Sequence, residues 1–148
     1  MRQTRVALAA ASEVVEGFED GVWWVGLAPL SDPDLVPQAV ASVLDVREAP
    51  GRSLTEVLAE HLKPKKTLLV LDNCEHLIDA CAILIDTLLR ACPAFKVLAT
   101  SREALGVAGE RAWLVPSLSL TDPERLPPVE ELRGCEAVRL FVDRARRR

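Results

Sequence analysis

The chain has 148 residues, about half of them hydrophobic, and a formal net charge of −4. This length is enough for one domain with its own core. No apolar run reaches the roughly 18 residues of a membrane span, and the acidic balance argues against a dedicated nucleic-acid surface. The amino terminus has no basic-then-apolar secretory pattern, so we expect a cytoplasmic protein.

The first half of the chain predicts one strand among three helices. In chain order these elements are a helix, a strand and two helices, over residues 5–16, 21–27, 33–44 and 54–62. Pro33 suits the first turn of its helix, because a proline there loses no hydrogen bond that the helix would make. Ser53 and Glu56 are spaced as a capping box, which marks the start of the next helix.

A short apolar run, Leu68 to Leu71, ends abruptly in Asp72. Such a run predicts a buried strand of a parallel sheet, covered on both faces. In open α/β sheets the ligands bind outside the carboxyl ends of the strands, so Asp72 lies where ligand chemistry takes place. An apolar strand that ends in aspartate is typical of the Walker B segment of P-loop hydrolases, where the carboxylate holds Mg²⁺. A solvated aspartate that caps the following helix is the alternative interpretation.

The second half continues the alternation of helices and strands. It predicts a helix, a strand, a short helical turn and a last strand over residues 77–89, 95–100, 103–105 and 112–115. Helices alternating with strands indicate a parallel sheet in an α/β layer fold. We therefore divide the chain into an α/β core over 1–115, a proline-rich linker over 116–133 and the start of a helical domain over 134–148.

The spacing of the cysteine and histidine residues does not indicate a metal site or a catalytic nucleophile. The cysteines, none in a Cys-x-x-Cys pair, are Cys74, Cys81, Cys92 and Cys135. We interpret them as small packing residues in a reducing compartment. A metal site made of Cys74, His76 and Cys81 would match no common zinc spacing. For His61 and His76 we expect surface or capping roles, because neither has a nucleophile beside it in the sequence.

A second polar strand end strengthens the interpretation of Asp72. The strand over 95–100 ends in Thr100-Ser101-Arg102, and parallel strands present their carboxyl ends at the same edge of a sheet. A carboxylate beside a guanidinium suits a magnesium nucleotide, because the metal bridges phosphate oxygens while the arginine neutralises the terminal phosphate. The alternative is that Arg102 pairs with Glu103 or Glu110 on the surface.

The two strand ends together carry a family resemblance. Residues Leu68-Leu69-Val70-Leu71-Asp72-Asn73-Cys74-Glu75-His76-Leu77 and Val97-Leu98-Ala99-Thr100-Ser101-Arg102-Glu103-Ala104-Leu105-Gly106 resemble the NB-ARC-type STAND ATPases of bacteria. The resemblance covers most of the chain and implies a three-layer α/β/α P-loop NTPase-like sheet that binds ATP or ADP with Mg²⁺. It also implies a switch module of a transcriptional regulator, whose partners are the nucleotide and flanking DNA-binding, helical and TPR-like domains. We expect no membrane contact and no direct nucleic-acid binding by this segment.

The resemblance assigns roles to individual residues. Asp72 corresponds to the Walker B aspartate that holds the metal, and Glu75 is a nearby acidic residue that could orient water. Arg102 corresponds to the sensor arginine that reads the terminal phosphate, and Thr100 is expected to contact the nucleotide beside it. Thr4 matches the threonine of the phosphate loop, which coordinates Mg²⁺.

The sequence also departs from the family. Gln3 stands where the lysine of the phosphate loop belongs, Arg2 stands where its last glycine belongs, and the family's first strand has no counterpart here. At the carboxyl end, the sequence stops before the position of the family's Gly-x-Pro motif. We therefore expect a module that is incomplete at both ends and binds ATP weakly, because the loop supplies much of the grip on the phosphates. The hydrolysis of ATP stays an open question, and a nucleotide-free pseudo-ATPase that acts as a protein-interaction module is the alternative function.

A phosphoacceptor receiver domain would also place an aspartate at the end of a central strand. It further needs an acidic pair after its first strand and a lysine after its last. Here the strand over 21–27 is followed by Ala28-Pro29, and the strand over 112–115 is followed by Pro116-Ser117. Both requirements fail, so we set this fold aside.

Overall fold

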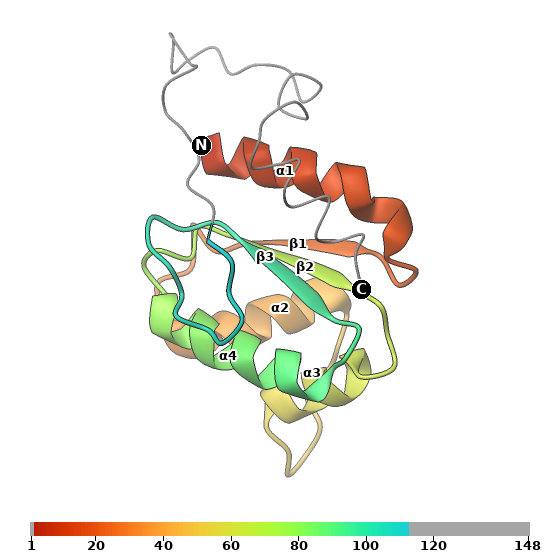
Figure 1. Cartoon of the computed structure of the whole chain (residues 1–148). Coiled ribbons are helices and arrows are strands. Elements are labelled where there is room, and N and C mark those ends of the chain that lie inside the picture. The colour runs from red at the N-terminus through yellow and green to blue at the C-terminus, as the bar shows by residue number, and fades with distance from the viewer. Residues whose placement is uncertain (1, 113–148) are drawn as a thin grey trace, which may run out of the picture. The chain divides into compact units, whose positions relative to one another are not determined.

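The computed structural model describes residues 2–112, which belong to two compact units (Figure 1). The described part of the first unit contains helix α1 (Arg2–Val14) and the 3₁₀ turn η1 (Val15–Gly17). The second unit, Phe18–Glu110, contains every described strand. The predicted linker and final helix lie outside the described residues, as does the predicted strand over 112–115 apart from Ala112, which is in irregular structure.

The second unit is built on a parallel sheet of three strands in the order β1-β2-β3. The strands are β1 (Val22–Gly26), β2 (Leu68–Asp72) and β3 (Lys96–Ala99). Gly26 lies opposite Asp72 across the first pair, and Leu71 lies opposite Ala99 across the second. The carboxyl ends of all three strands therefore meet at one edge. The expected α/β class with a parallel sheet is confirmed, whereas its three-layer, P-loop NTPase-like form stays a prediction.

Three helices cover one face of this sheet (Figure 1). They are α2 (Val36–Leu44), which follows the 3₁₀ turn η2 (Pro33–Leu35), then α3 (Leu54–Leu62) and α4 (Ile78–Ala91). The predicted capping box begins α3, where Glu56 N donates to Ser53 Oγ at 3.2 Å and Ser53 N donates to Glu56 Oε2 at 3.4 Å. These two bonds satisfy donors that the first turn of a helix leaves without a partner.

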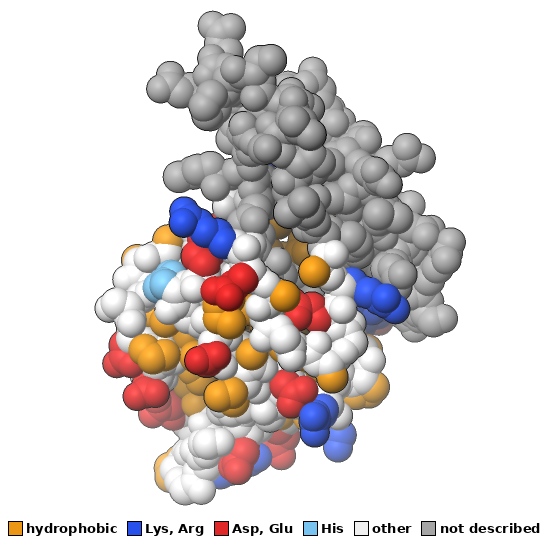
Figure 2. All heavy atoms as spheres, turned by 60° about the vertical axis from the view of Figure 1, so that its left-hand side comes forward, with side chains coloured by type: hydrophobic (Ala, Val, Ile, Leu, Met, Phe, Trp, Pro, Cys, Tyr) orange, Lys and Arg blue, Asp and Glu red, His pale blue; other side chains and the backbone are white. Residues whose placement is uncertain are grey.

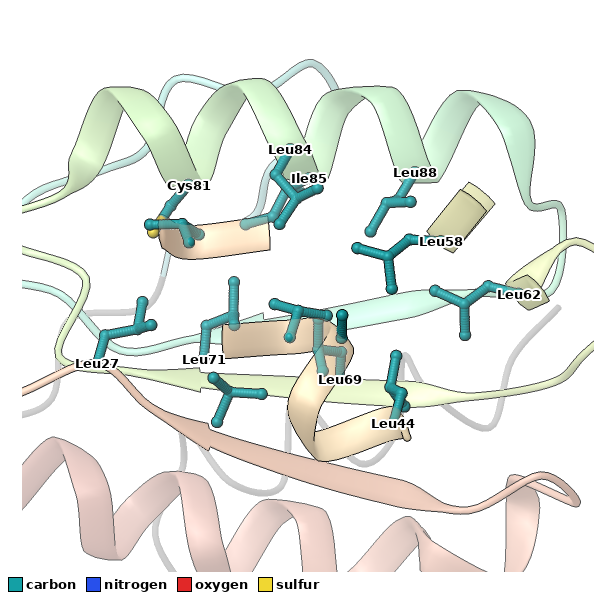
Figure 3. Packing of buried hydrophobic residues seen from close by; sticks show 14 of the residues in the cluster. Leu27, Leu44, Leu58, Leu62, Leu69, Leu71, Cys81, Leu84, Ile85 and Leu88 are labelled. Carbon is teal, nitrogen blue, oxygen red and sulfur yellow. The ribbon is translucent and has the colours of Figure 1, made fainter. Parts of the chain in front are cut away.

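Every residue of β2 is buried, as the apolar run predicted. Side chains alternate between the two faces of a strand, so Leu69 and Leu71 pack toward the three helices while Leu68 and Val70 point the other way. Figure 3 shows Leu69 and Leu71 facing apolar side chains of the helices. Those labelled on α3 and α4 are Leu58, Leu62, Cys81, Leu84, Ile85 and Leu88. Burial of each large aliphatic side chain stabilises the unit by about 1.5–3 kcal/mol.

The described cysteines behave as packing residues. Cys74, Cys81 and Cys92 are buried with free thiols and belong to the same hydrophobic cluster, whereas Cys135 lies outside the described residues. A hydrogen bond with Cys81, together with burial, raises the pKa of the Cys74 thiol, and burial raises the pKa of Cys92. The packing role predicted for these three residues is confirmed.

The surface of the described residues is mixed. On the face seen in Figure 2, acidic side chains are spread among hydrophobic ones rather than gathered in one patch. Within residues 2–112, none of the helices combines the length and the apolar character that crossing a bilayer requires.

The short helical turn predicted over residues 103–105 is wrong. The chain forms an irregular loop there, held by the carboxylate of Glu110, which accepts from Leu105 N at 2.9 Å and from Gly106 N at 2.7 Å. Gly106 has a φ of 79°, a conformation that glycine adopts without strain. The Glu110 carboxylate takes the place of the backbone carbonyl groups that would accept these two hydrogen bonds in a helix. The loop therefore satisfies its backbone donors without forming a helical turn.

Candidate functional site

Two polar side chains meet where β2 and β3 end. Asp72 is the last residue of β2, and Thr100 directly follows β3. Thr100 Oγ1 donates a hydrogen bond to Asp72 Oδ1 at 2.6 Å, and each residue is only 6% exposed. The prediction that these strands are adjacent and present both residues at one edge is confirmed. We call this region, formed by Asp72–Glu75 and Thr100–Arg102, the carboxyl edge.

The backbone turns sharply as it leaves β2. Asn73 has a φ of 63°, in the left-handed region that asparagine tolerates better than most residues. Its N–H donates to Thr100 Oγ1 at 2.9 Å, and Cys74 N donates to the carbonyl oxygen of Thr100 at 3.0 Å. The loop that carries Glu75 therefore leaves the strand in a fixed direction.

A loose ion pair lies beside Asp72. Arg102 Nε is 3.9 Å from Glu75 Oε1, and the Arg102 side chain is 86% exposed. An exposed pair of this length contributes between about 0 and 1 kcal/mol. The guanidinium therefore pairs with Glu75, instead of with Glu103 or Glu110 as the alternative interpretation had it, and a phosphate could take it over at little cost in free energy.

The same glutamate has an oxygen without a partner. Glu75 Oε2 is buried and makes no hydrogen bond. A buried acceptor without a partner costs free energy and calls for a specific explanation, such as a bound ion or a water molecule. A cation or a water molecule could each supply the partner that Glu75 Oε2 lacks within the protein.

The donor set fits Mg²⁺ that arrives with a nucleotide. Magnesium prefers oxygen ligands and is held by one or two carboxylates together with substrate phosphates, whereas a complete protein cage is unusual. Asp72 and Glu75 supply carboxylates of this kind. Within residues 2–112 no cluster of three or more His, Cys, Asp or Glu side chains could hold a metal by itself. Asp72 and Glu75 would therefore need further oxygen ligands, such as water or phosphate oxygens, to complete the coordination of Mg²⁺.

Thr4, the remaining residue predicted to bind metal, lies in the first turn of α1. It belongs to the first compact unit, and the carboxyl edge belongs to the second. The structure thus brings together Asp72, Glu75, Thr100 and Arg102 in one unit, and Thr4 belongs to the other.

Sequence reasoning missed the scaffold of the edge. His76 Nε2 donates to the carbonyl oxygen of Leu30 at 2.6 Å, which ties the loop after β2 to the loop after β1. These two residues are 46 positions apart, and a lone histidine gave no signal of such a contact. The left-handed turn at Asn73 could have been predicted from the sequence, because asparagine directly after a strand-end aspartate is suited to that conformation.

Comparison with known proteins finds homologues of this chain. It is 42% identical over 147 residues to an uncharacterized protein of Mycobacterium tuberculosis, an alignment that covers 99% of this chain and 34% of the relative. It is 44% identical over 145 residues to a "Putative HTH-type transcriptional regulator" of the same organism, covering 98% of this chain and 15% of that protein. Mycobacterium bovis has relatives with the same names at the same identities.

These alignments are partial for the relatives. The chain spans about a third of the length of the first curated relatives that it matches and about a seventh of the regulator. No family model matches the chain, and no solved structure matches it.

Proposed function

We propose that this chain carries the nucleotide-binding core of a STAND-type signalling ATPase and serves as a switch module of a transcriptional regulator. The observation that carries the proposal is the hydrogen-bonded pair Asp72–Thr100 at two adjacent parallel strand ends, with the Arg102–Glu75 pair beside it. Ligands of open α/β sheets bind at this edge. A carboxylate next to a weakly held guanidinium complements a magnesium-bound phosphate.

We infer a role for each residue from the family resemblance and from its contacts. Asp72 would hold the Mg²⁺ ion, which when bound neutralises charge on the phosphate oxygens. Arg102 would exchange Glu75 for the terminal phosphate, because its ion pair is long and exposed. Glu75, released from the arginine, is then placed to accept a hydrogen bond from a water molecule. The exchange of partners by Arg102 is the event that a switch could report.

The regulatory part of the proposal is supported by the homologue named as an HTH-type transcriptional regulator. In such a protein the nucleotide module would act on a DNA-binding domain elsewhere in the chain. The partners of this segment would be the nucleotide and flanking protein domains.

Calorimetric titration of the 148-residue chain with Mg-ATP tests the nucleotide function. We expect weak binding that disappears when EDTA removes the metal and in the variants Asp72→Asn and Arg102→Ala. Arg90→Ala is a matched control, because Arg90 is also an exposed arginine that pairs with one carboxylate but lies on α4. It should bind Mg-ATP like the unmodified chain.

A nucleotide-free interaction module is the second candidate. It is favoured by Gln3 at the position of the family's lysine, because that lysine supplies much of the grip on the phosphates. A folded chain that shows no heat of binding with Mg-ATP at millimolar concentration would contradict the nucleotide function and support this one.

A further inference from the structure

The hydroxyl group of Thr100 makes two hydrogen bonds, and chemistry fixes their direction. The backbone N–H of Asn73 can only donate, so Thr100 Oγ1 accepts from it at 2.9 Å. The hydroxyl therefore donates its own hydrogen bond to Asp72 Oδ1 at 2.6 Å, a short distance typical of hydroxyl–carboxylate pairs. One side chain therefore holds both the carboxylate of Asp72 and the backbone of the next residue.

The backbone of Thr100 holds the same segment from the other side. Thr100 N donates to the carbonyl oxygen of Leu71 at 2.9 Å, and the carbonyl oxygen of Thr100 accepts from Cys74 N at 3.0 Å. Together with the hydroxyl contacts, Thr100 makes four hydrogen bonds to the segment Leu71–Cys74. The last residue of β2 and the turn after it are thus fixed against a single residue of the neighbouring strand end.

This arrangement differs from that of a residue that binds nucleotide directly. Thr100 is 6% exposed, and its hydroxyl is engaged as both donor and acceptor. Its hydroxyl instead restrains the Asp72 carboxylate and, through the left-handed Asn73, the direction of the loop that carries Glu75. Hydrogen bonds to ligating carboxylates set ligand orientation, and their loss typically lowers metal affinity by about 10–100-fold.

We propose that Thr100 is a positioning residue for a divalent cation: its hydroxyl orients Asp72 toward the ion and holds the turn at Asn73. The proposal rests on the proposed function, because the cation is the one that would accompany the nucleotide. Thr100 thus acts through Asp72 and does not itself contact the phosphates.

Two substitutions separate positioning from general stability. Thr100→Val keeps the shape of the side chain but removes the hydroxyl, and Thr100→Ser keeps the hydroxyl. We expect Thr100→Val to lower the affinity for Mn²⁺, measured by electron paramagnetic resonance in the presence of ATP, by about tenfold or more. Thr100→Ser should restore it. Ser53→Ala, which loses a capping hydrogen bond on α3 and no contact of the carboxyl edge, should keep the Mn²⁺ affinity of the unmodified chain, whereas a merely structural role of Thr100 would predict a similar loss of affinity in this variant.

A measurement without any ligand tests the geometry directly. Amide hydrogen exchange should become faster at Asn73 in Thr100→Val, because its N–H loses its acceptor, and return to the original rate in Thr100→Ser. The amide of Leu69, in the interior of β2, is the internal control: its exchange reports any loss of global stability, and exchange at Asn73 should accelerate more than exchange at Leu69. Unchanged exchange at Asn73 in Thr100→Val would overturn the proposed contact.

The remaining outcomes distinguish this proposal from the proposed function. Equal Mn²⁺ affinity of Thr100→Val and the unmodified chain would overturn the positioning role. If the chain binds Mn²⁺ alone at millimolar concentration, Thr100→Val weakens that binding and ATP does not bind, then the positioning role stands and the nucleotide function fails. If the unmodified chain binds no Mn²⁺ with or without ATP, both proposals are overturned.

Discussion

Leu71 and Asp72 are neighbours in β2 and both are buried, yet they belong to regions held together in different ways. Leu71 packs in the cluster beneath the sheet, where stabilisation is spread over many weak and non-directional contacts. Asp72 belongs to the carboxyl edge, where order depends on a few directed hydrogen bonds, chief among them the one from Thr100. A side chain lost from the core should therefore reduce stability, whereas a side chain lost from the edge should mainly reduce ligand binding.

The largest expected effect tests the core side of this comparison. Leu71→Ala should lower the free energy of unfolding by about 3 kcal/mol, because it removes buried methyl groups and leaves a cavity. Urea denaturation followed by circular dichroism measures the change. Ile83→Ala is the control: this side chain on α4 is 70% exposed, so its loss should change stability by less than about 0.5 kcal/mol. Equal effects of the two substitutions would contradict the packing of β2.

A substitution of Asp72 tests the carboxyl edge. Asp72→Ala should leave the fold intact and lower the free energy of unfolding by about 1–2 kcal/mol, because the Thr100 hydroxyl then lacks its acceptor. Mg²⁺-dependent ATP binding should be lost completely. Denaturation and calorimetry on the same preparation measure both quantities. If Asp72→Ala destabilised the chain as much as Leu71→Ala and retained Mg-ATP binding, the division between core and edge would be wrong.

The two regions also differ in how well the sequence predicts them. The apolar periodicity of α4 and the run from Leu68 to Leu71 placed these elements correctly, because a core face repeats its signal at every turn or every second residue. The adjacency of Asp72 and Thr100 followed from the rule that parallel strands end at one edge. The assignment of the edge to a metal nucleotide came from a family resemblance and stays a prediction.

Contacts made by single side chains could not be predicted from the sequence. Nothing local to His76 indicates that it meets Leu30, because the contact exists only once two loops are folded against each other. The loop over 103–105 was mistaken for a helical turn because its acceptors come from the Glu110 side chain, several residues further along. The core repeats its signal along the sequence and a contact of a single side chain does not, so the loops are where an expectation from sequence fails first.

Directed hydrogen bonds also occur at the ends of the helices that cover the core. Ser53→Ala should lower the free energy of unfolding by about 1 kcal/mol, because it removes the acceptor for Glu56 N in the first turn of α3. Ser42→Ala is the matched control, since Ser42 is an exposed residue within α2, where alanine is the better helix former. Thermal unfolding of both variants tests this. A larger loss for Ser42→Ala would contradict the capping box.

The smallest expected effect concerns a titratable group that borders the core. Burial and the neighbouring charge of Lys65 lower the pKa of His61, which lies in the last turn of α3. Lys65 Nζ lies 3.0 Å from His61 Nε2, so the lysine donates to the neutral imidazole and repels the protonated one. At a pH between the lowered folded value and the ordinary value near 6.5, the unfolded chain binds more protons than the folded chain.

Stability should therefore rise with pH through this window, with the full contribution of His61 present above about pH 6.5 and lost as the pH falls below it. The urea midpoint of the unmodified chain should fall more between about pH 7.5 and 5.5 than that of His61→Gln. Lys65→Gln should show an intermediate slope, because it removes the charge but leaves the burial, which is the larger cause. A slope in Lys65→Gln as small as in His61→Gln would show that the charge, and not burial against the core, controls this histidine.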